Sequence, residues 1–70
     1  MSNVGEVETA ILKALEELDE PSGCGDIGKQ ADINWRTVLG KLRGLKKDNL
    51  VESPIKGKYV ITQKGKSLIE

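Results

Sequence analysis

The sequence contains no histidine and a single cysteine, Cys24, among its 70 residues. Histidine is the most common metal ligand and general base in proteins, and a lone cysteine cannot form a disulfide within its own chain. These absences exclude hydrolytic triads, Cys/His nucleophile pairs and zinc sites. No glycine-rich cofactor loop is found either. We therefore expect a protein that is not an enzyme, with no catalytic residues, no metal ligands and no cofactor.

Aromatic residues and long apolar runs are also scarce. There is no phenylalanine, and Trp35 and Tyr59 are the only aromatic residues. Leucine, isoleucine, valine and alanine must therefore form the core of one small domain spanning residues 1–70, and such a core rarely supplies more than about 3–5 kcal/mol of net stability. No apolar run exceeds three residues, whereas a membrane span needs about 20. Because no export signal opens the chain, we expect a soluble, cytoplasmic protein without a membrane partner. No small-molecule ligand is indicated.

The net charge of zero conceals an asymmetry between the two halves of the chain. Residues 1–32 carry eight carboxylates against two lysines, and residues 33–70 carry nine basic side chains against three carboxylates. The formal charges are therefore −6 and +6. Since one core must hold both halves, the sequence predicts a bipolar molecule whose basic side attracts a polyanion.

Helical periodicity is clearest at the start of the chain. Apolar residues recur at steps of three and four, which predicts a helix over about residues 4–19. The apolar stripe of this helix consists of Val4, Val7, Ala10, Ile11, Ala14, Leu15 and Leu18. Asn3 and Glu6 have the spacing of a capping box, and Pro21-Ser22-Gly23 is expected to end the helix.

Two further helices are predicted over residues 25–32 and 35–48. Gly25 and Gly28 disfavour the first of them, so it must depend on packing. Asn34 is the expected N-cap of the next helix, with Ile33 packing the turn onto the core. Asn49 is expected to close that helix in a left-handed conformation. The inward residues of this helix are expected to be Val38, Leu39, Leu42 and Leu45.

The apolar period then changes from 3.6 to 2. Leu50–Pro54 and Lys58–Thr62 are predicted to be two short strands, joined by a tight turn that needs a positive φ at Gly57. Thr62 is the expected N-cap of a last helix over residues 63–69, with Leu68 and Ile69 packing back onto the core. The fold class is therefore α+β: a three-helix core, a two-stranded hairpin and a short C-terminal helix.

Three segments resemble winged helix-turn-helix DNA-binding domains. They are Asp26–Val38, which resembles the helix-turn-helix (about residues 25–48); Leu42–Val51, which resembles the end of the recognition helix; and Tyr59–Gly65, which resembles the second wing strand and the start of the last helix. The resemblance covers about residues 5–69 and is closest to small archaeal and bacterial transcription regulators. It implies a recognition helix that enters the major groove of double-stranded DNA, with the hairpin (about residues 50–62) as the wing that contacts the backbone or the minor groove.

The residues of the third helix give an independent reason to expect a DNA-contacting face. At about 100° per residue, Arg36, Gly40, Arg43 and Lys47 fall on the side opposite the apolar stripe. Arg36 matches the O6 and N7 edge of guanine, whereas Thr37 suits a thymine methyl group or a phosphate. The candidate DNA-binding residues are Arg36, Thr37, Gly40, Lys41, Arg43, Lys47, Lys56 and Lys58. The lysines and Arg43 in this set are suited to contact phosphates that flank the groove.

Some assignments stay open. Gly40 and Gly44 fit either a close approach of the DNA backbone or a loss of side-chain contacts. Trp35 is predicted to cover the core rather than to contact a base, and Tyr59 and Cys24 are also expected to pack. The alternative function is a protein-interaction module of the same fold. A homodimer or another protein partner is a further possibility.

Overall fold

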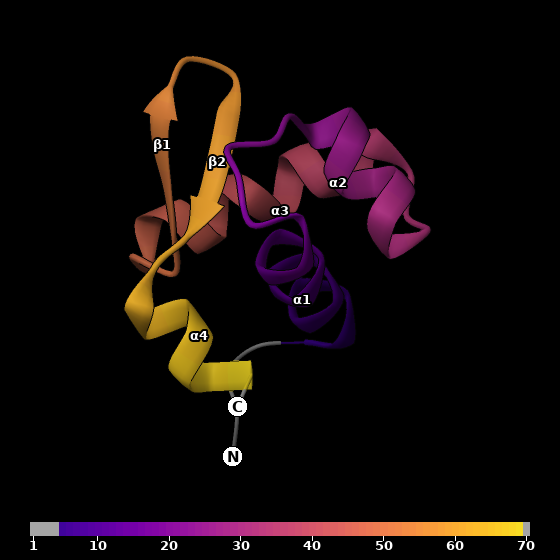
Figure 1. Cartoon of the computed structure of the whole chain (residues 1–70). Helices are drawn as coiled ribbons and strands as arrows, with labels where there is room; N and C mark the ends of the chain where they lie inside the picture. The colour runs from indigo at the N-terminus through magenta and orange to yellow at the C-terminus, as the bar shows by residue number, and fades with distance from the viewer. Residues whose placement is uncertain (1–4, 70) are drawn as a thin grey trace.

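Four helices and one hairpin make up the fold in a computed structural model that describes residues 5–69 (Figure 1). The elements are, in chain order, α1 (Glu6–Leu18), α2 (Cys24–Ala31), α3 (Trp35–Lys47), β1 (Val51–Ile55), β2 (Lys58–Ile61) and α4 (Gln63–Ile69). The predicted order and the α+β class are confirmed, and most boundaries lie within one or two residues of those expected.

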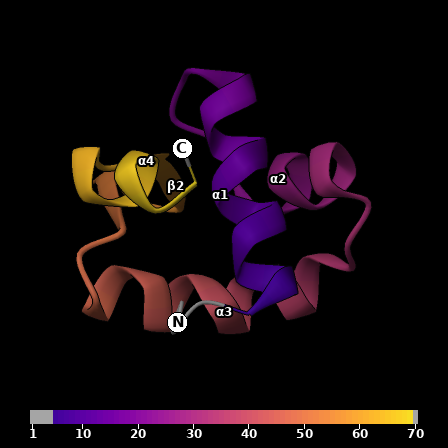
Figure 2. The same ribbon diagram turned by 90° about the horizontal axis from the view of Figure 1, so that it is seen from below.

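Helix α1 occupies the centre of the molecule (Figure 2). It packs against α2 on one side, against α4 and β2 on the other, and against α3. For that reason Leu12, which lies outside the predicted apolar stripe, is as fully buried as Ile11. The core comprises Ile11, Leu12, Ala14, Leu15, Ile27, Val38, Leu42, Leu45, Leu50 and Val51.

The ends of α1 differ from the expectation. The N-cap is Gly5, whose backbone N–H donates to the Glu8 carboxylate at 3.0 Å, whereas the expected partner Asn3 and the expected first residue Val4 lie outside the described residues. At the other end Asp19 adopts a left-handed conformation with φ 51° and ends the helix before Pro21 is reached.

A short segment after α1 pairs with the hairpin. The backbone N–H of Ser22 donates to the Tyr59 carbonyl at 3.0 Å, and the N–H of Tyr59 donates to the Ser22 carbonyl at 2.8 Å. Ser22 is buried, and its hydroxyl donates to the Glu20 carbonyl. The pairing adds a third strand-like segment at the edge of the sheet, and it fixes the wing to the loop between α1 and α2.

The turn between α2 and α3 brings two backbone segments unusually close. The Gly28 carbonyl accepts from the N–H of Ile33 at 2.8 Å, and a Cβ placed on Gly28 would lie 2.5 Å from the Ile33 carbonyl oxygen. Only glycine fits this approach without a shift of the backbone. Asn34 caps α3 as predicted, since its side-chain oxygen accepts from the N–H of Arg36 at 2.9 Å.

The hairpin is antiparallel, with Glu52 opposite Val60 and Ile55 opposite Lys58. Between these pairs β1 has one more residue than β2, so Ser53 and Pro54 form a bulge. Pro54, predicted at the end of the strand, lies in this bulge, where its missing N–H leaves no ladder bond broken. Gly57 has the expected positive φ of 79°, and Asn49 has φ 63°.

Helix α4 starts at the predicted cap. The Thr62 hydroxyl accepts from the N–H of Gly65 at 3.1 Å and donates to the Asn49 carbonyl at 2.7 Å. Ile69 packs against the core, but the prediction for Leu68 is wrong, because that side chain is exposed. Cys24 and Tyr59 are partly buried against the core, as predicted. None of the described helices has the length and apolar character that crossing a membrane would require.

Candidate nucleic-acid interface

Helix α3 presents one face to the core and the opposite face to solvent. The buried face consists of Val38, Leu42 and Leu45. A row of four other residues lies on the opposite side, about 180° around the helix. This outward row consists of Arg36, Gly40, Arg43 and Lys47, and all four are exposed. The other four predicted residues, Thr37, Lys41, Lys56 and Lys58, are exposed as well.

Two glycines of α3, Gly40 and Gly44, leave the backbone on its solvent-facing side uncovered by side chains. A Cβ added to Gly40 or Gly44 would meet nothing within 4 Å. Neither glycine is therefore required by packing inside the molecule, although each weakens the helix by about 1 kcal/mol relative to alanine. A backbone left bare in this way can approach another surface closely.

Trp35 differs from its prediction as a cover for the core. The side chain is 49% exposed, and the Arg36 guanidinium carbon lies over the indole ring at 5.4 Å from its centre. As the first residue of α3, Trp35 has no preceding helical turn to cover it. By helical angle Trp35 lies at the border of the apolar stripe of α3, and this position is the signal of its exposure that the sequence contains.

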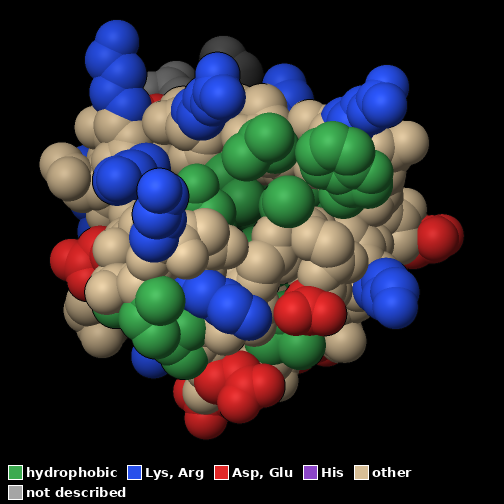
Figure 3. All heavy atoms as spheres, turned by 90° about the horizontal axis from the view of Figure 1, so that it is seen from above, with side chains coloured by type: hydrophobic (Ala, Val, Ile, Leu, Met, Phe, Trp, Pro, Cys, Tyr) green, Lys and Arg blue, Asp and Glu red, His purple; other side chains and the backbone are tan. Residues whose placement is uncertain are grey.

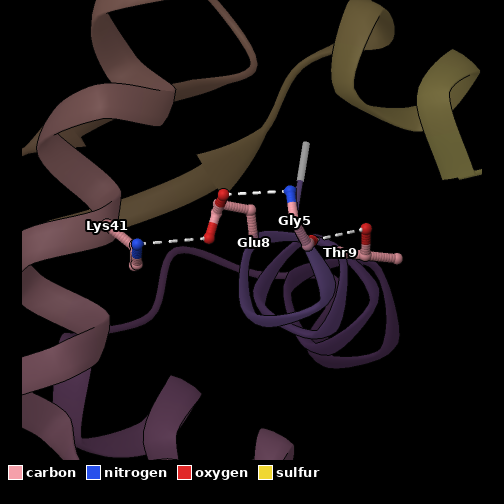
Figure 4. A network of polar contacts seen from close by, with 4 residues as sticks. All are labelled: Gly5, Glu8, Thr9 and Lys41. Atoms are coloured by element: carbon pink, nitrogen blue, oxygen red, sulfur yellow. Dashed lines mark hydrogen bonds and ion pairs between the residues drawn. The ribbon is translucent and has the colours of Figure 1, made fainter. Parts of the chain in front are cut away.

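Lys41 lies on the flank of α3 that faces α1, apart from the outward row. Its ammonium nitrogen is 3.5 Å from the Glu8 carboxylate, which also accepts from the N–H of Gly5 (Figure 4). The Gly5 hydrogen bond, and then the charge of Lys41, lower the pKa of Glu8 below its usual value of 4.5. Of the eight predicted contacts, Lys41 is thus the one that forms an ion pair among the described residues 5–69.

The contacts of Glu8 with the Gly5 N–H and with Lys41 should make folding stability depend on pH. Because the pKa of Glu8 is lower in the folded state, its contribution is present above pH 4.5 and is lost as the pH falls through the folded-state pKa. We expect Glu8→Gln to lower the free energy of unfolding by about 0.5–1 kcal/mol at pH 7, and by less at pH 3. Urea unfolding at both pH values measures the difference. Glu6→Gln, which removes a carboxylate from the same helical turn, is the control, and an equal pH dependence in both variants would contradict the prediction.

The wing carries the remaining predicted residues. Lys56 lies in the turn and Lys58 opens β2, and both are exposed. Ile55, at the end of β1, is 58% exposed, which makes it one of three large exposed apolar residues within 5–69, with Trp35 and Leu68. The wing tip therefore combines positive charge with an apolar side chain.

Charged side chains are unevenly distributed on the surface. Viewed from above, Lys and Arg side chains line the edge formed by α3 and the side that carries the wing, while carboxylates gather mainly at the opposite edge (Figure 3). Apolar side chains lie between the basic ones on this face (Figure 3). Within the described part of the chain, no group of three or more Cys, Asp or Glu residues is arranged to hold a metal ion.

A hollow of about 460 Å³ adjoins the start of α3. Lys29, Asn34 and Trp35 are among the residues that line it. The hollow thus brings Lys29, on α2, to the same end of α3 that carries Arg36.

Comparisons with known proteins agree with this fold. A family model described as winged helix-turn-helix matches residues 5–70. Eight chains of solved structures match, among them the crystal structure of T. acidophilum IdeR, with a TM-score of 0.80 and 22% sequence identity. That match covers 99% of this chain and 33% of the IdeR chain, so the present chain spans a third of its length. No curated protein matches.

Proposed function

Because the chain belongs to the winged helix-turn-helix family, we propose that it is a DNA-binding transcription regulator that inserts α3 into the major groove. The hairpin then contacts the backbone or minor groove beside it. The observation that carries the proposal is the outward row of α3, in which Arg36, Arg43 and Lys47 are exposed together with the bare backbone of Gly40. Gly44, beside this row, leaves a second stretch of backbone bare.

The residues divide by the part of the duplex they suit. Arg36, in the first turn of α3, donates two hydrogen bonds from its planar guanidinium group to the O6 and N7 atoms of guanine. Thr37 beside it suits a thymine methyl group. Arg43 and Lys47, further along α3, suit phosphates at the edge of the groove. Lys56 and Lys58 extend this set of phosphate contacts to the wing.

Lys41 is a weaker candidate for a phosphate contact than the other basic residues. Its ion pair with Glu8 is partly exposed and therefore contributes little to stability, so a phosphate can displace the carboxylate. That exchange replaces one negative partner with another. We therefore expect Lys41 to add less to affinity than Arg43 does.

Salt dependence tests the proposal directly. Titrating the protein with a random-sequence duplex at 50 to 200 mM salt should give log K against log[salt] with a slope near −5, because about six phosphate contacts release counterions. A slope near zero would contradict DNA binding and favour the protein-interaction module. The same titration, followed by sedimentation, gives the number of copies bound per duplex.

A further inference from the structure

An exposed tryptophan is unusual in a protein with so few aromatic residues. Trp35 is 49% exposed, does not belong to the buried core cluster, and borders the hollow at the start of α3. Burying a large aromatic side chain is a major source of folding stability in a small domain. The ring instead lies where α3 meets solvent, which points to a role outside the core.

The side chain of Arg36 is the clearest partner of this ring. Its guanidinium carbon lies over the indole at 5.4 Å from the ring centre, within the range of a cation–π interaction. Its backbone N–H is held by Asn34 at 2.9 Å. Arg36 is therefore restrained at both ends, at the backbone by the helix cap and at the guanidinium by the ring.

We propose that Trp35 is a specificity-determining residue of the DNA interface: it holds the Arg36 guanidinium in place to read a base, and its exposed edge packs on the DNA beside that base. The inference rests on the proposed function and deepens it. Together the two side chains form one reading unit at the start of α3.

The physical reason is preorganisation. An unrestrained arginine loses rotamer freedom when it is fixed against a base, and this loss weakens binding. Because Arg36 already lies against the Trp35 ring in the free protein, much of this rotamer freedom is lost before DNA binds. An arginine that stacks on an aromatic ring keeps its N–H groups at the periphery, where they remain available to the O6 and N7 atoms of guanine. The ring edge adds apolar contact with a thymine methyl group, which needs no charge.

The role differs from that of the phosphate-binding lysines in one measurable way. Losing a phosphate contact weakens binding to every sequence and lowers the salt slope by about 0.9. Losing a base-reading unit weakens binding to the preferred sequence only, and leaves the slope unchanged. Trp35→Ala should therefore affect discrimination rather than general affinity.

The experiment compares two duplexes. One is the tightest duplex recovered with the wild-type protein from a randomised pool, and the other is a random-sequence duplex. We expect Trp35→Ala to weaken binding to the selected duplex about tenfold, with less than a twofold change for the random duplex and an unchanged salt slope. Trp35→Phe retains a ring and should lose less. Leu68→Ala, at an exposed apolar residue on α4, is the matched control and should change neither affinity.

A double-mutant cycle tests the coupling. Arg36→Ala should reduce discrimination as Trp35→Ala does, and the double variant should lose little more than either single variant. Trp35 is the only tryptophan, so its fluorescence should change when the selected duplex binds to the wild-type protein. Urea unfolding of each variant confirms that the fold is retained.

The outcomes separate the inference from the proposed function. If the wild-type protein binds with a steep salt slope but Trp35→Ala weakens both duplexes equally, or neither, the inference is overturned and the proposed function stands. Additive losses in the cycle, or a wild-type protein that binds without sequence preference, overturn the inference as well. Absence of salt-dependent binding by the wild-type protein overturns the proposed function itself.

Discussion

Replacing Arg43 and Lys47 together with glutamate should reduce duplex affinity more than a hundredfold at 0.1 M salt. Both side chains are exposed on the outward row of α3, one helical turn apart, where the groove edge brings phosphates close. Each reversal removes a counterion-releasing contact and places a carboxylate against a phosphate. The fold should be retained, because neither side chain lies in the core. Titration with a random-sequence duplex measures the loss.

A control variant separates the effect of net charge on affinity from the effect of where the charges lie. Lys13→Glu combined with Lys66→Glu makes the same change in net charge at an exposed lysine on α1 and a partly exposed lysine on α4, outside the proposed interface. We expect this control to weaken binding by less than about tenfold, since charges beyond one Debye length are largely screened. Equal losses in the two double variants would contradict an interface on α3.

Gly28→Ala should lower the free energy of unfolding by about 2–3 kcal/mol. The new Cβ would lie 2.5 Å from the Ile33 carbonyl oxygen, and the atoms in its way belong to the backbone of the turn between α2 and α3. Relieving the overlap requires moving this turn, which also carries the N-cap Asn34. A domain with about 3–5 kcal/mol of stability would then be close to unfolding. Urea unfolding followed by circular dichroism measures the change.

Gly25→Ala is the matched control on the same helix. Nothing lies within 4 Å of a Cβ at Gly25, so alanine should raise stability by up to about 1 kcal/mol through helix propensity. The two substitutions are chemically identical and three residues apart, and we expect opposite signs. A stabilising effect of Gly28→Ala would contradict the close contact between Gly28 and the Ile33 carbonyl at the turn.

Features set by neighbouring residues along the chain could be predicted. Asn34 caps α3, Asn49 and Gly57 take positive φ, and Thr62 caps α4, each at the expected position. Capping and turn preferences depend on a few adjacent residues, so the local sequence contains the information they need. The outward row of α3 followed from helical periodicity for the same reason.

Features that depend on distant segments could not be predicted. Leu12 is buried because α1 is surrounded on several sides, and periodicity alone indicates one buried face and no more. Ser22 pairs with Tyr59, and Lys41 with Glu8, across 37 and 33 positions of sequence. No local preference specifies such partners.

The sequence by itself determined the order of the elements, the caps and turns that delimit them, and the separation of charge between its two halves. The tertiary structure alone decided that Leu12 is buried while Trp35 and Leu68 are exposed, and that Lys41 faces a carboxylate while Arg43 faces solvent. The physical reason is that secondary structure follows from interactions between near neighbours, whereas burial and ion pairing follow from which surfaces the packed helices bring together.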